Sequence, residues 1–138
     1  MLYKILNKLL KMPDKNDFIL LEGDEYLSSP IDLTPKFHHY KHQISLISGI
    51  AWDHVNVFKT AADYNKQFEI FINSITPGGV LIYNEEDITL STMVNLSQNT
   101  IRKESYHTAP HFIDSGRTYL ETDEGALPLK VFGDHNLS

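Results

Sequence analysis

Three short apolar runs constrain the fold of this chain most, because each has the length and composition of a buried β-strand. The runs are Phe18–Leu21, Ile44–Ser48 and Val80–Tyr83. Between the second and the third, apolar residues recur at helical spacing over residues 60–74, and Thr76–Gly79 then forces a turn. Apolar strands that alternate with helices predict an α/β fold with parallel strands.

The second half of the chain has a different pattern. A weaker helix is predicted over residues 89–96, and short strands are predicted beyond it. These strands cover residues 100–106, 111–113, 117–122 and 127–132. The turn sequences Asp114-Ser115-Gly116 and Asp123-Glu124-Gly125 join them in a hairpin pattern. We therefore predict parallel strands with helices followed by a small antiparallel β region, all within one domain over residues 1–138.

Two further segments carry weaker signals. Leu2, Ile5, Leu6, Leu9 and Leu10 recur at helical spacing, and Met12-Pro13-Asp14 ends the predicted helix. Lys and Asn residues interrupt this stretch, so it is neither a transmembrane span nor a typical signal peptide. Residues 23–42 show no sustained period and are predicted to form a long ordered loop.

Composition excludes several classes of partner. The net charge is −6 and the sequence has no dense cluster of Lys and Arg, so neither nucleic acid nor an anionic membrane is an expected partner. The chain has no cysteine and hence no disulfide framework, which fits a reducing compartment. We therefore expect a cytoplasmic protein.

Two polar segments follow the first two predicted strands directly, Glu22–Tyr26 and Gly49–Asn56. Ligands in open α/β sheets bind at the carboxyl ends of strands, so Glu22 and His54 are candidates for one site. A carboxylate and an imidazole can share a divalent cation such as Mg²⁺. Two alternatives remain open for these residues: a solvated acidic turn beside a His54 that binds only backbone, or a small metal-dependent hydrolase that also uses Asp24.

Four strings in order carry a resemblance to a known family. They are Glu22-Gly23-Asp24-Glu25-Tyr26, Pro35-Lys36-Phe37-His38-His39-Tyr40, Asp53-His54-Val55-Asn56-Val57-Phe58 and Gly133-Asp134-His135-Asn136. Over residues 17–138 the chain resembles the central domain of the Mur ligases, the ATP-dependent amide-forming enzymes of peptidoglycan synthesis. This resemblance implies part of a P-loop NTPase-like α/β domain. Details of the first two strings resemble the branch that recycles a tripeptide, and the alanine-adding branch comes second.

The resemblance implies catalytic roles for two residues. Glu22 matches the family's metal-binding Glu, and His54 matches the His of its Asp-His motif. Both are expected to hold the Mg²⁺ that bridges the ATP γ-phosphate and the substrate carboxylate. In that mechanism the carboxylate of UDP-N-acetylmuramate attacks the γ-phosphate. The amine of a tripeptide or of L-alanine then displaces phosphate from the resulting acyl phosphate.

Other site residues follow from the same resemblance. His135 and Asn136 match a string that lies near the nucleotide base in the family. Tyr26, Asp53 and Asn56 are candidate substrate contacts. Gln67 occupies the place of a carbamylated Lys that several branches have.

The chain also departs from the family pattern. The sequence contains no Gly-x-x-x-x-Gly-Lys-Ser/Thr string, so the groups that cradle ATP phosphates are missing from it. The expected domains for the UDP-sugar and for the amine are not in this sequence either. We therefore expect a ligase fragment that neither hydrolyses ATP nor forms amide bonds in isolation. The alternative is a stand-alone binding or structural module that kept the fold and lost catalysis.

Overall fold

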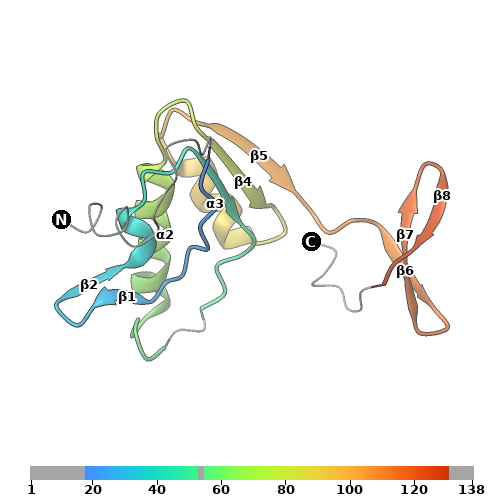
Figure 1. Ribbon diagram of the computed structural model, residues 1–138, viewed down its shortest axis with the longest axis horizontal. Coiled ribbons are helices and arrows are strands. Elements are labelled where there is room, and N and C mark those ends of the chain that lie inside the picture. Colours follow the sequence, from blue (N-terminus) through green and yellow to red (C-terminus); the bar gives the residue numbers. More distant parts are fainter. Residues whose placement is uncertain (1–17, 53–54, 131–138) are drawn as a thin grey trace.

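The computed structural model describes residues 18–52 and 55–130, and the predicted N-terminal helix over residues 2–10 lies outside this part (Figure 1). In chain order the elements are β1 (Leu27–Ser29), β2 (Asp32–Pro35), the 3-10 helix η1 (Lys36–His39), β3 (Ile44–Ile47), α2 (Ala61–Ser74), β4 (Val80–Asn84), α3 (Ile88–Leu96), β5 (Arg102–Tyr106), β6 (His111–Asp114), β7 (Arg117–Thr122) and β8 (Gly125–Pro128). None of the described helices is long and apolar enough to cross a membrane.

A parallel sheet of order β3-β4-β5 forms the centre of the fold. The predicted strands over 44–48 and 80–83 are confirmed as β3 and β4. The predicted strand over 100–106 also exists as β5, but it was wrongly assigned to the antiparallel region, since it pairs in parallel with β4. The chain passes from β4 through α3 to β5, so a helical crossover connects these two parallel strands. The hairpin pattern that we predicted begins only after β5.

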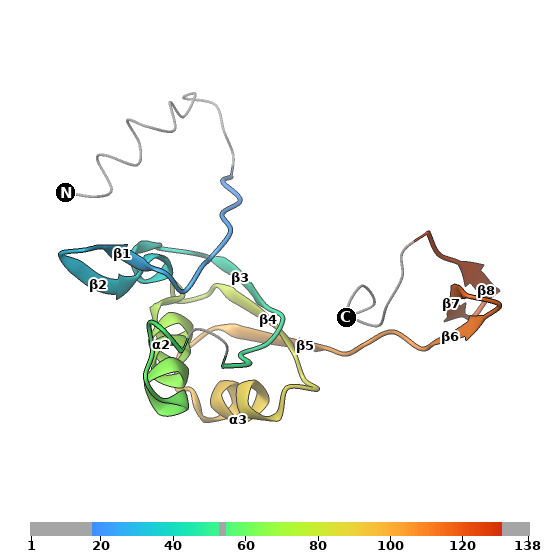
Figure 2. The ribbon, with the colours of Figure 1, turned by 90° about the horizontal axis from the view of Figure 1, so that it is seen from below.

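Helices α2 and α3 cover one face of this sheet (Figure 2). Tyr64, Phe68 and Ile72 of α2 are buried, as are Leu90 and Val94 of α3. These helix residues pack against the sheet, whose strand residues are alternately buried and exposed. In β3, for example, Ile47 is buried in the core and Leu46 is exposed. The apolar pattern predicted over residues 60–74 is therefore confirmed as a buried helix face, and the hydrophobic core lies between the two helices and one face of the sheet.

The turn into β4 requires glycine at two positions. Gly78 has φ +81°, in the left-handed region that favours glycine. A Cβ on Gly79 would lie 2.5 Å from the backbone oxygen of Gln43 and 2.8 Å from that of Thr76. The close approach brings Val80 N within 2.8 Å of Gln43 O, so the predicted turn also sets the register between β4 and β3.

The first apolar run does not form the predicted strand. Residues 18–25 are irregular, and the side chains of Phe18 and Leu20 are 82% and 90% exposed. In Figure 2 this segment runs on the side of the sheet away from α2 and α3. Apolar composition alone predicted a strand here, but among the described residues no neighbouring strand pairs with it.

Residues 23–42 contain regular structure where a loop was predicted. Strands β1 and β2 form an antiparallel hairpin, and η1 follows at once. Phe37 of η1 is buried, and its ring lies 5.6 Å from that of Phe68 and 5.0 Å from that of Phe71. This aromatic cluster fixes the hairpin and η1 against α2.

A three-stranded antiparallel sheet, β6-β7-β8, ends the described part of the chain and confirms the predicted hairpin region. Strand β8 begins and ends earlier than the predicted strand over 127–132. In Figures 1 and 2 this sheet stands apart from the α/β unit, and residues 107–110 join the two. Within residues 111–128, Thr118 alone is buried, so the small sheet has almost no core of its own.

The core position of Ile72 gives a first test. Replacing Ile72, which is 0% exposed, with Ala should lower the free energy of unfolding by about 2–5 kcal/mol, because a cavity remains between α2 and the sheet. Ile70→Ala is the matched control on the same helix, where the side chain is 41% exposed and the cost should be below about 1 kcal/mol. Urea unfolding followed by circular dichroism measures both, and equal losses would contradict the described core.

Candidate functional site

The structure describes three of the predicted site residues, Glu22, Tyr26 and Asn56, and all three are exposed. Glu22 lies in the irregular segment before β1, so the reason given for its placement, the end of a buried strand, was wrong. Asn56 lies in a turn between β3 and α2. Asp53, His54, His135 and Asn136 lie outside the described residues, so the convergence of Glu22 with His54 stays a prediction.

The carboxylates of Glu22, Asp24 and Glu25 differ in whether they contact other residues of the chain. Asp24 accepts the backbone N–H of Tyr26 at 3.1 Å and pairs with Lys36 Nζ at 3.0 Å. Glu25 accepts a hydrogen bond from the hydroxyl of Tyr64 at 3.0 Å. Glu22 is exposed and has no hydrogen-bond or ion-pair partner among the described residues. Two of the three carboxylates therefore hold the segment in place, and Glu22 is available for an external ligand.

This difference among the three carboxylates affects the predicted Mg²⁺ site. Within residues 18–52 and 55–130, no group of three or more His, Asp or Glu side chains could hold a metal ion. A site built on Asp24 is disfavoured, because Lys36 already neutralises that carboxylate. A free carboxylate such as Glu22 suits Mg²⁺, which usually takes one or two protein carboxylates and completes its shell with water and phosphate oxygens. The donor chemistry of Glu22 therefore fits the implied ion.

The segment after β3 is anchored by a residue that sequence reasoning missed. Asp87, which lies between β4 and α3 and directly precedes α3, accepts the backbone N–H of Ile50 through Oδ2 at 2.8 Å and that of Leu90 through Oδ1 at 3.0 Å. The second bond caps the N-terminus of α3. An Asp directly before a predicted helix could have been recognised as a capping residue, but its bond to Ile50, 37 positions away, had no local signal in the sequence.

The same segment is also tied at its far end. The indole Nε1 of Trp52 donates to the carbonyl of Phe58 at 3.1 Å. Phe58 is 7% exposed and packs in the core, and Thr60 then caps α2 by accepting the N–H of Asp63. Residues 50–58, whose sequence contains the Asp-His motif, are thus held at both ends.

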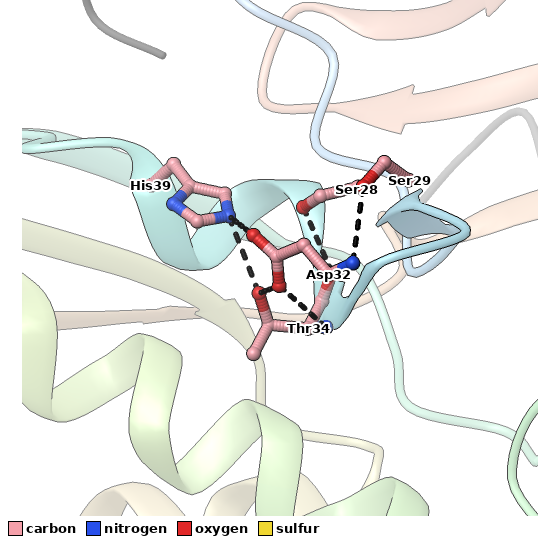
Figure 3. Close-up of polar contacts among 5 residues, drawn as sticks. All are labelled: Ser28, Ser29, Asp32, Thr34 and His39. Atoms are coloured by element: carbon pink, nitrogen blue, oxygen red, sulfur yellow. Dashed lines mark hydrogen bonds and ion pairs between the residues drawn. The ribbon is translucent and has the colours of Figure 1, made fainter. Parts of the chain in front are cut away.

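A polar cluster on the β1–β2 hairpin offers no reactive arrangement (Figure 3). Asp32 accepts hydrogen bonds from the hydroxyl of Thr34 at 2.6 Å and from its N–H at 3.1 Å, and lies 3.1 Å from His39 Nε2. The two bonds from Thr34 lower the pKa of the Asp32 carboxyl, with a smaller effect from His39. The same His39 nitrogen lies 3.2 Å from the Thr34 hydroxyl. In a catalytic proton relay, one ring nitrogen of the histidine contacts the carboxylate and the other contacts the hydroxyl. Here a single nitrogen of His39 contacts both groups, so the cluster stabilises the hairpin and has no catalytic geometry.

His42 is part of the packing of η1 against α2. Its ring stacks on Phe71 with centroids 4.2 Å apart, and Nδ1 lies 3.2 Å from the carbonyl of Tyr40. Burial lowers the pKa of His42 below its ordinary value, so the ring is neutral at pH 7. A neutral ring packed on an aromatic side chain has a structural role.

Comparison with known proteins identifies related sequences. No family profile matches the chain. It is 30% identical over 131 residues to the UDP-N-acetylmuramate–L-alanyl-γ-D-glutamyl-meso-2,6-diaminoheptandioate ligase of Escherichia coli (strain K12), covering 89% of this chain and 29% of that ligase. It is 34% identical over 73 residues to the UDP-N-acetylmuramate–L-alanine ligase of Porphyromonas gingivalis, covering 53% of this chain and 14% of that ligase.

A solved structure has the same fold. The UDP-N-acetylmuramate:L-alanyl-γ-D-glutamyl-meso-diaminopimelate ligase from Neisseria meningitides superposes with a TM-score of 0.64 at 19% identity, over 83% of this chain and 38% of that one. The curated homologues of this chain are Mur ligases, and the structure that it resembles is a Mur ligase too. The matches include the ligase named for the L-alanyl-γ-D-glutamyl-diaminopimelate peptide, called the tripeptide ligase below, and the alanine ligase. The chain spans less than a third of either curated relative.

The double role of Asp87 can be tested by substitution. Asp87→Ala should cost about 2–3 kcal/mol of unfolding free energy, because a lost cap costs about 1 kcal/mol and an unsatisfied N–H at Ile50 adds about as much or more. Asp87→Ser should restore the cap of α3 but is too short to bridge to Ile50. Amide hydrogen exchange should therefore quicken at Ile50 in both variants and at Leu90 in the Ala variant alone.

The control is Thr60→Ala, which removes the cap of α2 and leaves Asp87 intact. It should cost about 1 kcal/mol and leave the Ile50 amide protected. An Ile50 amide that exchanges at the wild-type rate in Asp87→Ser would show that the bridge does not anchor this segment.

Proposed function

We propose that this chain is part of an ATP-dependent amide ligase of peptidoglycan synthesis or recycling. The observation that carries the proposal is its similarity to the tripeptide ligase along most of its length, together with a parallel sheet whose β3 is followed by the segment bearing the Asp-His motif. The whole ligase would join UDP-N-acetylmuramate to a peptide or amino acid at the cost of ATP. Catalysis belongs to that larger assembly, since this sequence has no phosphate loop.

In this proposal Glu22 and His54 would hold Mg²⁺, which would supply positive charge to neutralise the transferring phosphoryl group. Glu22 is suited to the role because Asp24 and Glu25 are already engaged and leave it free. Asp87 and Trp52 hold the two ends of the segment that contains His54. The remaining predicted contacts are His135 and Asn136 to the nucleotide, and Tyr26, Asp53 and Asn56 to substrate.

The tripeptide is the preferred amine substrate, and L-alanine is the second candidate. The preference rests on the extent of similarity, which covers most of the chain for the tripeptide ligase and about half of it for the alanine ligase. The η1 region points the same way, because Lys36-Phe37-His38-His39-Tyr40 resembles the tripeptide branch. A cytoplasmic location fits a chain without cysteine.

A non-catalytic module that retains the fold is the second candidate function. The observation in its favour is the lack of a Gly-x-x-x-x-Gly-Lys-Ser/Thr string in this sequence. The genomic sequence upstream of the codon for Met1 separates the two candidates. An in-frame phosphate loop there supports the ligase, and a stop codon without one supports the module.

The isolated chain should release no ADP from ATP when UDP-N-acetylmuramate and either tripeptide or L-alanine are present with Mg²⁺. The physical reason is that no group in this sequence cradles the β- and γ-phosphates, and two metal ligands alone do not orient the nucleotide. A coupled ADP assay measures this. ADP release that requires both UDP-N-acetylmuramate and an amine would overturn the expectation.

In the complete protein, Glu22→Gln should lower the rate of phosphate release at least ~10–100-fold, since loss of a metal ligand should cost no less than loss of its supporting contacts. The melting temperature should stay unchanged, because Glu22 is exposed and has no partner among the described residues. Glu124→Gln, at an exposed carboxylate in the β7–β8 turn, is the matched control and should keep the wild-type rate. A wild-type rate for Glu22→Gln at limiting Mg²⁺ would exclude Glu22 as a ligand.

A further inference from the structure

Tyr64 lies where three segments of the fold meet. It belongs to α2 and is 2% exposed. The centroid of its ring lies 5.1 Å from that of Phe68 in the core and 5.5 Å from that of Phe58, which lies between β3 and α2. Its hydroxyl donates a hydrogen bond of 3.0 Å to Glu25, in the acidic string before β1. A single side chain therefore joins the helical core to the acidic string and to the segment after β3.

The acidic string needs such a fixed point. Residues 18–25 form neither helix nor strand, so no backbone ladder holds them. Asp24 pairs with Lys36, but both side chains are more than a third exposed, and an ion pair in solvent contributes little. The contact with Tyr64 is different, because a hydroxyl buried this deeply requires a hydrogen-bond partner. The bond to Glu25 thus fixes the string to a helix of the core.

Holding Glu25 also limits where Glu22 can lie. The two residues are three positions apart, so their Cα atoms are at most ~10–11 Å apart in any conformation. Between them, Gly23 lies against η1, where a Cβ would be 3.7 Å from that of Phe37. Mg²⁺ demands ligand oxygens at ~2.0–2.1 Å in nearly ideal octahedral geometry. An anchored segment presents a carboxylate in that geometry more often than a loose segment does.

We propose that Tyr64 is a positioning residue for Glu22. The hydroxyl of Tyr64 holds Glu25, and Glu25 fixes the segment from which Glu22 reaches Mg²⁺. In this role Glu25 acts as a hydrogen-bond acceptor and is not itself a metal ligand. The inference rests on the proposed function, which assigns Glu22 to the metal.

The first experiment measures the order of the acidic string in this chain. Tyr64→Phe keeps the buried ring and removes the hydroxyl. In this variant, ¹⁵N relaxation should give backbone order parameters below ~0.6 at Gly23 and Asp24, the range of flexible backbone. Tyr83→Phe is the matched control, since Tyr83 is also buried in the core and its hydroxyl bonds to none of the described residues. Wild-type order at Gly23 and Asp24 in Tyr64→Phe would overturn the proposal.

The second experiment measures how phosphate release by the complete protein depends on Mg²⁺. Tyr64→Phe should raise the Mg²⁺ concentration for half-maximal rate about 10-fold, the lower end of the ~10–100-fold cost of losing a group that supports a metal ligand. The rate at saturating Mg²⁺ should stay near that of the wild type, because Glu22 is still present. Tyr83→Phe should not change the Mg²⁺ requirement. A general loss of stability would lower the saturated rate instead, so an unshifted requirement in Tyr64→Phe would contradict the proposal.

Two substitutions of Glu25 separate its position from its charge. Glu25→Gln keeps an oxygen that can accept the hydroxyl of Tyr64 and should retain the wild-type Mg²⁺ requirement. Glu25→Ala should raise the requirement as Tyr64→Phe does, and the two changes together should add nothing further, because they remove the same contact. Equal shifts in Glu25→Gln and Glu25→Ala would show that the charge of Glu25 acts on the metal and would overturn its role as an acceptor.

Glu22→Gln distinguishes a failure of this inference from a failure of the proposed function. A shift of the Mg²⁺ requirement in Glu22→Gln but not in Tyr64→Phe would leave Glu22 as a ligand and overturn the role of Tyr64 alone. Wild-type Mg²⁺ dependence in both variants would overturn the metal role of Glu22 and this inference with it.

Discussion

The packing of α2 against the central strand β4 is the interaction on which the rest of the structure depends. Ile72 of the helix and Leu81 of the strand are both completely buried, and the other core residues gather around them. The turn through Gly79 places β4 beside β3 at the end of the same helix. Phe71, also on α2, packs its ring against the rings of both Phe37 and His42. The sheet, the hairpin and η1 therefore all take their positions from one helix.

Local sequence patterns predicted the elements whose causes are local. The periodicity of α2, the turn at Thr76–Gly79 and the apolar runs of β3 and β4 are signals that neighbouring residues carry together. Features that depend on distant partners were misjudged. Residues 18–21 are as apolar as a strand but pair with no described strand, and β5 was placed in the wrong sheet because its partner is set by a crossover.

In the candidate site, too, the features with local causes could be predicted and those that depend on distant partners could not. Motif matching selected Glu22 from a string of acidic residues, but only the contacts to Lys36 and Tyr64 explain why its neighbours are engaged and Glu22 is not. Asp87 could be predicted as a helix cap from position alone. Its bond to Ile50 joins the ends of two adjacent strands, and a contact between residues 37 positions apart leaves no periodic trace in the sequence.

The small sheet of β6, β7 and β8 has a consequence for how this protein unfolds. It is held mainly by its own backbone ladder, with a stacked pair of Phe112 and Tyr119 at 5.2 Å and a single buried residue over 111–128. Such a unit opens with a free energy of its own, well below that of the α/β unit. A single thermal transition would then report on α2 and its sheet, while proteases and solvent deuterium would reach the last strands in molecules that are otherwise native.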